Sequence, residues 1–175
     1  GLDSPNGWQR DTAQRLLIEQ KAMWSTETLH ESPAIAVQQL WTMHTLGTLK
    51  PSHLRAAFQS PSAQVREHAI RLAEGRDMTA DLIRLQNDPD LRVRTQLAFS
   101  LGEASNDTLT ALVKAEPTNK SLLIAALSSS PNHPEASNWQ KALKSSPQPS
   151  TTPKLQIITN HNPDRDKVVK DYAGV

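Results

Sequence analysis

The sequence contains no cysteine, and several other residue classes are scarce. Without cysteine, the 175 residues can form no disulfide, no thiolate metal site and no covalently attached haem. Aromatic residues make up only 4%, and no apolar run approaches the ~18 residues that a membrane-spanning helix needs. The formal net charge is +1, and lysine and arginine are scattered. We therefore expect no membrane insertion and no nucleic-acid partner.

The length is that of about one domain, on a prior of ~100–200 residues per domain. The N-terminus "GLDSPNGWQR" has neither an initiator methionine nor the profile of a signal peptide. We interpret the chain as a piece of a longer protein.

Five prolines recur at a constant interval of 28 residues. Serine and aspartate, which are good helix N-caps, precede four of them, and proline is favoured at the first position of a helix. We predict that a helix begins at each proline. The prolines are Pro5, Pro33, Pro61, Pro89 and Pro117, and the residues before them are Ser4, Ser32, Ser60, Asp88 and Glu116.

Apolar residues follow each proline at helical spacing. The positions four and eight residues after the proline predict one buried helix face. They are Gln9, Val37, Val65, Val93 and Ser121, and then Ala13, Trp41, Ala69, Leu97 and Ala125. A second, shorter helix is predicted in each repeat around Leu29, Ala57, Leu85, Val113 and Lys141. Left-handed glycines are predicted near the end of the first helix, at Gly47, Gly75 and Gly102.

A helix pair of this size cannot bury its apolar stripe alone, so several pairs must stack. The sequence therefore predicts an all-α superhelix, an α-solenoid of about five helix pairs over residues 4–144. The fifth repeat places Ser121 and Lys141 where the other repeats are mostly apolar. This substitution is typical of a terminal repeat with a wetter outer face.

The C-terminal part differs in composition. Residues 145–153, "SSPQPSTTP", consist of Ser, Thr and Pro apart from Gln148, which predicts an extended linker. Residues 154–175 regain apolar side chains. We predict that Leu155–Ile158 packs back onto the repeats and that a short helix from about Pro163 leads toward a next domain. Proteolysis confined to the linker would support this docking.

Three arginines stand at equivalent places in the repeats: Arg10, Arg66 and Arg94. Each can reach a carbonyl or a carboxylate of its own or the next repeat, which predicts a structural ladder; ligand contact is the alternative. Asp88 and Asp90 are interpreted as helix caps rather than as an acid and a base.

Two tryptophans of the first repeat, Trp8 and Trp24, are candidates for contact with a partner domain. Trp41 lies on the predicted core stripe and is interpreted as packing. The histidines form no i, i+4 pair or HExxH motif, and no GxSxG or phosphate-binding loop occurs. We predict no catalytic, cofactor-binding or metal-ligating residues.

The repeated segments resemble the HEAT family in its short variant. The resemblance is carried by "DPDLRVR" at Asp88–Arg94, "SPSAQVRE" at Ser60–Glu67 and, in degenerate form, "RDTAQRLL" at Arg10–Leu17. It covers roughly Ser4 to Lys144. It implies an armadillo-type solenoid, and such an architecture does not specify a function.

A second resemblance concerns "SPNGWQRDTAQRLLIEQ" at Ser4–Gln20 and "NPDRDKVVKDYAGV" at Asn162–Val175. These stretches are similar to the segment between a β-propeller and a c-type cytochrome domain in the membrane-bound dehydrogenases of planctomycetes and verrucomicrobia. The resemblance implies that the partners are these neighbouring domains and that the location is extracytoplasmic or periplasmic. This chain has no CxxCH motif, so haem binding does not carry over. Propeller chemistry does not carry over either.

Two functions fit these observations. In the first, the chain is a non-catalytic scaffold that links domains of a larger, haem-containing redox protein. In the second, it is part of an oxidoreductase and lines a substrate or electron-transfer path between propeller and cytochrome. A third reading, a HEAT-like DNA-binding enzyme, is weakened because the chain has no basic stripe.

Overall fold

The computed structural model describes residues 1–145 and shows that their regular structure is entirely helical. The linker predicted at 145–153, except Ser145, and the docking segment predicted at 154–175 lie outside the described residues. The helices are α1 (Gly7–Glu19), α2 (Pro33–Thr45), α3 (Pro51–Phe58), α4 (Ala63–Ala73), α5 (Thr79–Ile83), η1 (Arg84–Asn87), α6 (Leu91–Leu101), η2 (Gly102–Ser105), α7 (Asn106–Ala115), α8 (Lys120–Ser129) and α9 (Ala136–Ser145).

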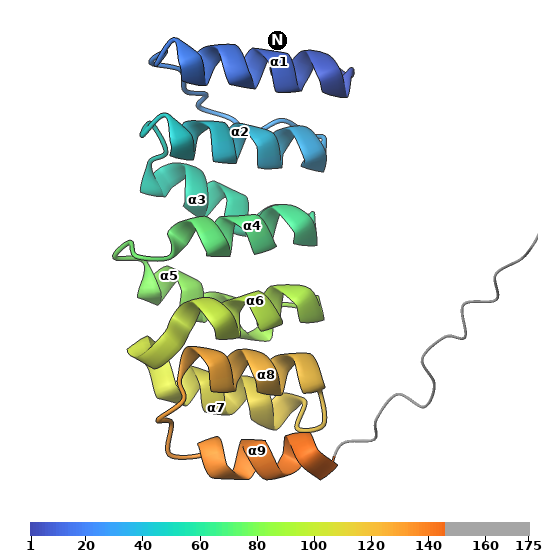
Figure 1. Ribbon diagram of the computed structural model, residues 1–175, viewed down its shortest axis with the longest axis vertical. Helices are drawn as coiled ribbons and strands as arrows, with labels where there is room; N and C mark the ends of the chain where they lie inside the picture. The colour runs from blue at the N-terminus through green and yellow to red at the C-terminus, as the bar shows by residue number, and fades with distance from the viewer. Residues whose placement is uncertain (146–175) are drawn as a thin grey trace, which may run out of the picture.

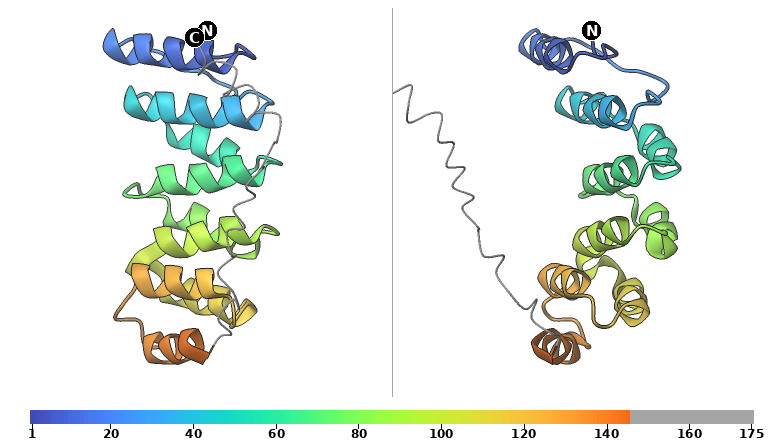
Figure 2. Two further views of the ribbon diagram at one scale, coloured as in Figure 1. Left: turned by 45° about the vertical axis from the view of Figure 1, so that its right-hand side comes forward. Right: turned by 90° about the vertical axis from the view of Figure 1, so that its right-hand side faces the viewer.

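The helices stack side by side along the long axis of the molecule (Figure 1). Helices α1, α2, α4, α6 and α8 lie in one layer, and α3, α5 and α7 lie in a second layer behind it (Figure 2). Helix α9 packs on α8 at the end of the stack opposite to α1. Apolar side chains from both layers form one buried core, which includes Leu40, Leu54, Ile70, Leu97, Leu112 and Leu122.

Four of the five repeats begin their first helix later than predicted. Only α2 begins at its proline, with Ser32 as N-cap. Helices α1, α4 and α6 begin two residues after the proline, and α8 begins three residues after Pro117. The prediction that every proline opens a helix is therefore wrong outside the second repeat. The N-caps are Asn6, Ser62, Asp90 and Asn119.

The residue before the proline closes a turn, which explains the later start. Asp88 Oδ1 accepts a hydrogen bond of 2.9 Å from the backbone N–H of Asp90. Ser60 Oγ accepts one of 3.2 Å from the N–H of Ser62. Side chains of this kind stabilise a turn two residues long in place of a helix cap. The N-cap is instead the residue after the proline, Ser62 or Asp90. Asp90 Oδ1 accepts a hydrogen bond of 2.8 Å from the backbone N–H of Arg92.

In the second repeat the same turn lies two residues earlier. His30 Nδ1 accepts a hydrogen bond of 2.9 Å from the N–H of Ser32, so the helix begins at Pro33. The buried face of α2 is shifted accordingly. Ala36 and Leu40 are buried, whereas Val37 and Trp41, which were predicted to be buried, lie at the edge of the core. The Trp41 Nε1–H donates to His68 Nδ1 of α4 at 3.1 Å.

The first repeat lacks its predicted second helix. Residues 20–32 contain no helix and cross the molecule as an irregular strap. Thr26 Oγ1 donates to the carbonyl of Thr28 at 2.8 Å, a local bond that competes with helical hydrogen bonding. The hydroxyl of Thr48 donates to the carbonyl of Trp24 at 2.6 Å and holds the strap to the end of α2. Trp24 and Leu29 pack against the edge of the core.

Candidate functional site

Arg66 joins two consecutive repeats. Its Nε and Nη2 atoms donate to the carboxylate of Asp88 at 2.7 and 2.8 Å. Its Nη1 donates to the carbonyls of Ser60 and Pro61 at 2.8 and 3.1 Å. The side chains of Arg66 and Asp88 are only 11% and 3% exposed. The hydrogen bond to Asp88 raises the pKa of Arg66.

Arg94 repeats this arrangement one repeat later, with one difference. Its Nη1 donates to the carbonyl of Asp88 at 2.6 Å, and its Nη2 pairs with Glu116. The Nε atom of Arg94 is buried and has no hydrogen-bond partner. Glutamate is one methylene longer than aspartate. Glu116 pairs with only one nitrogen atom of Arg94, whereas Asp88 accepts hydrogen bonds from two nitrogen atoms of Arg66.

Arg10 holds the same place in the first repeat. Its Nη1 donates to the carbonyls of Ser4 and Pro5 at 2.8 and 3.0 Å. Its Nε donates to Gln38 Oε1 at 3.0 Å, so an amide replaces the carboxylate of the later repeats. The three arginines therefore share one pattern. Each donates hydrogen bonds to backbone carbonyls before its own helix and to a side chain of the next repeat, so that neighbouring repeats are joined.

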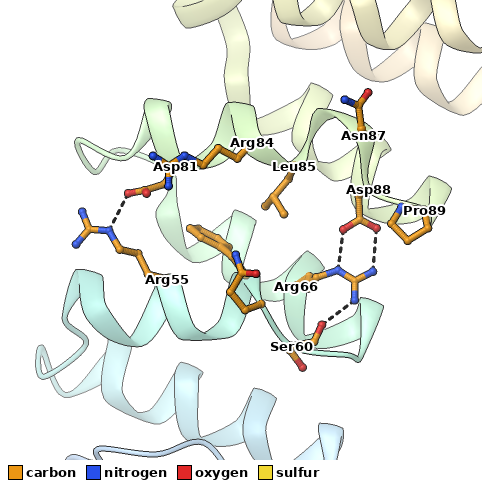
Figure 3. Close-up of a pocket in the computed structure, with 11 residues that line it drawn as sticks. Arg55, Ser60, Arg66, Asp81, Arg84, Leu85, Asn87, Asp88 and Pro89 are labelled. Carbon is orange, nitrogen blue, oxygen red and sulfur yellow. Dashed lines mark hydrogen bonds and ion pairs between the residues drawn. The ribbon is translucent and has the colours of Figure 1, made fainter.

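A hollow of about 540 Å³ lies beside the Arg66–Asp88 pair, between α3 and the α5–η1 segment (Figure 3). Arg55, Asp81 and Arg84 gather at one end, Arg66 and Asp88 lie at the other, and Leu85 lies between them (Figure 3). Arg55 Nε donates to Asp81 Oδ2 at 3.0 Å. Sequence analysis missed this site, because its residues come from three repeats and follow no common motif.

The N-terminal end of the stack is poorly covered. Helix α1 has no buried residue, and Trp8 is 73% exposed. A hollow of about 350 Å³ opens beside α1, with Leu16, Leu17 and Trp24 in its lining. Of the two tryptophans predicted to contact a partner, the structure places Trp8 in solvent and Trp24 partly against the core.

Among residues 1–145, no group of three or more histidine, aspartate and glutamate side chains is placed to hold a metal ion. Over the same residues, no helix has the length and apolar character required to cross a membrane. Asp90 is the N-cap of α6, and hydrogen bonds from Arg92 lower the pKa of its carboxyl group. Asp90 thus acts as a charged helix cap.

No family model, curated protein or solved structure matches this chain.

Proposed function

We propose that the chain is a non-catalytic scaffold, a short-HEAT-like α-solenoid that links domains of a larger, haem-containing redox protein. The single observation that carries the proposal is the uncovered face of α1 at one end of the stack. The proposed location, in line with the resemblance, is extracytoplasmic or periplasmic.

The exposed side chains of the first repeat support a contact at this end. Trp8 is 73% exposed, Leu16 43% and Met23 90%. Helices shorter than ~12–15 residues are marginal in water unless tertiary packing stabilises them, and α1 has 13 residues. Tryptophan is also enriched among the residues that dominate binding energy at protein interfaces. A partner domain seated on α1 would bury these side chains and stabilise the helix.

Hydrogen–deuterium exchange tests this proposal by comparing the isolated chain with the larger protein proposed to contain it, here called the parent. We expect the α1 amides to exchange more slowly in the parent, because a neighbouring domain covers them. The variant Trp8→Ala should restore fast exchange in the parent. The matched control is Phe99→Ala, since Phe99 is 44% exposed but belongs to α6.

Equal exchange of α1 in the isolated chain and in the parent would contradict the scaffold proposal. A path-lining role in an oxidoreductase predicts a different result: Trp8→Ala would slow reduction of the cytochrome domain without changing the exchange of α1.

A further inference from the structure

The hollow between α3 and α5–η1 is not used by the proposed contact at α1. It lies on the second layer of helices and is lined by residues of three consecutive repeats. On one side it is bordered by α5, which has only five residues, and by the 3₁₀-helix η1 that follows it; on the other side it is bordered by the end of α3.

The two ends of the hollow differ in charge. At one end, Arg66 and Asp88 satisfy each other with two hydrogen bonds, so that end is neutral. At the other end, Arg55 and Arg84 lie near a single carboxylate, that of Asp81, and the ion pair of this carboxylate is with Arg55 at 3.0 Å. Arg84 is exposed, and its side chain makes no hydrogen bond or ion pair with any residue of the described chain. This end therefore carries one uncompensated positive charge.

Between the charged ends, Phe58 and Leu85 form a small apolar floor. Phe58 and Leu85 both border the hollow and are 4% and 8% exposed. The side chains of Gln59 and Asn87 add amide groups at the rim. Eight of the eleven lining residues are polar or charged, so the hollow suits a ligand that combines a charged group with a small apolar one. An inorganic anion alone would leave this floor unused.

We propose that the hollow binds a peptide segment of a partner protein in which an aspartate or glutamate lies beside a bulky apolar side chain. The carboxylate pairs with Arg84, and the apolar side chain packs on Phe58 and Leu85. Arginine suits this role because its planar guanidinium group can bind a carboxylate through two parallel hydrogen bonds. The inference goes beyond the scaffold role and does not depend on the contact at α1.

Nuclear magnetic resonance titration of the ¹⁵N-labelled chain tests the site with blocked dipeptides. The probe acetyl-Glu-Leu-amide should shift the amide signals of α3 and α5–η1. Acetyl-Gln-Leu-amide and acetyl-Glu-Gly-amide, which lack the charge and the apolar side chain respectively, should each bind about tenfold more weakly. This comparison uses the unmodified chain and so does not depend on the folding of a variant.

The variant Arg84→Gln should reduce the affinity for acetyl-Glu-Leu-amide to that for the neutral probe. The matched control Arg71→Gln removes the same charge from an exposed arginine of α4 that does not line the hollow, and it should bind like the unmodified chain. Equal binding of the charged and neutral probes, or shifts elsewhere on the surface, would overturn the proposal. Inorganic phosphate binding as tightly as acetyl-Glu-Leu-amide would also overturn it. None of these results bears on the exchange of α1, so the two proposals fail separately.

Discussion

The guanidinium group of Arg66 and the carboxylate of Asp88 are joined by two hydrogen bonds of 2.7 and 2.8 Å between consecutive repeats. The same arginine binds the carbonyls of Ser60 and Pro61 at the entrance to its own helix. One side chain thus fixes both the turn of one repeat and the position of the next.

Removal of the buried arginine should destabilise the stack. Arg66→Ala leaves Asp88 Oδ2 and two carbonyls without their donor, so we expect the free energy of unfolding to fall by about 1–3 kcal/mol. Arg55→Ala is the control, because Arg55 also pairs with an aspartate but its side chain is 59% exposed. An exposed pair contributes about 0–1 kcal/mol. Chemical denaturation measures both values, and equal losses would contradict a structural role specific to Arg66.

The length of the acidic side chain should matter at the next position of the ladder. Glu116→Asp places an aspartate opposite Arg94, as Asp88 lies opposite Arg66. The shorter side chain offers a hydrogen-bond partner to the buried Nε of Arg94. We expect the free energy of unfolding to rise by about 1 kcal/mol, the contribution of one hydrogen bond. The reciprocal control, Asp88→Glu, should lower it. If both exchanges are destabilising to the same extent, the equivalence of the two positions is disproved.

His53 should make stability depend on pH. Burial lowers the pKa of His53 from its ordinary value of 6.5, and the charge of Lys50 lowers it further, while Glu27 opposes the shift. Its Nδ1 accepts from the N–H of Lys50 at 3.1 Å, a contact that protonation at Nδ1 removes. The unfolded chain therefore binds the proton more readily. The stabilisation is complete above pH 6.5 and is lost as the pH falls toward the lowered pKa.

The measurement compares the chain with its His53→Gln variant between about pH 5.5 and 7, above the range in which ordinary carboxylates titrate. The difference in free energy of unfolding should shrink as the pH falls. A difference that does not vary with pH would show that His53 has no linkage to folding.

Gly75 should resist substitution for a reason of backbone conformation alone. It follows α4 with φ of +70°, and a Cβ atom at this position would meet no other atom within 4 Å. Gly75→Ala should therefore cost about 1–2 kcal/mol from the left-handed conformation without a steric clash. Gly7→Ala, at the first residue of α1, is the control and should cost nothing, because alanine is favoured in helices. Thermal unfolding of the two variants distinguishes strain in the left-handed backbone at Gly75 from the loss of backbone flexibility that accompanies any glycine-to-alanine substitution.

The sequence alone was sufficient for the helical class and for the repeat. The 28-residue interval places Val65 and Val93 in the same buried position of α4 and α6, because a helical period is a local property of the chain. It also places Arg66 and Arg94 at equivalent points of successive repeats. The three glycines predicted to have positive φ all do, since only glycine adopts this conformation at little cost.

The tertiary structure decided what depends on contacts between distant residues. Some helix starts depend instead on a local contact that the repeat does not reveal, since the side chains of Asp88 and His30 each bond to the backbone two residues later. In the first repeat, residues 20–32 form no helix, and Trp24 and Leu29 pack against the edge of the core. The hollow with the unpaired Arg84 brings together residues of three repeats. A period in the sequence specifies which residues are equivalent, whereas contacts in three dimensions specify which of them are left without a partner.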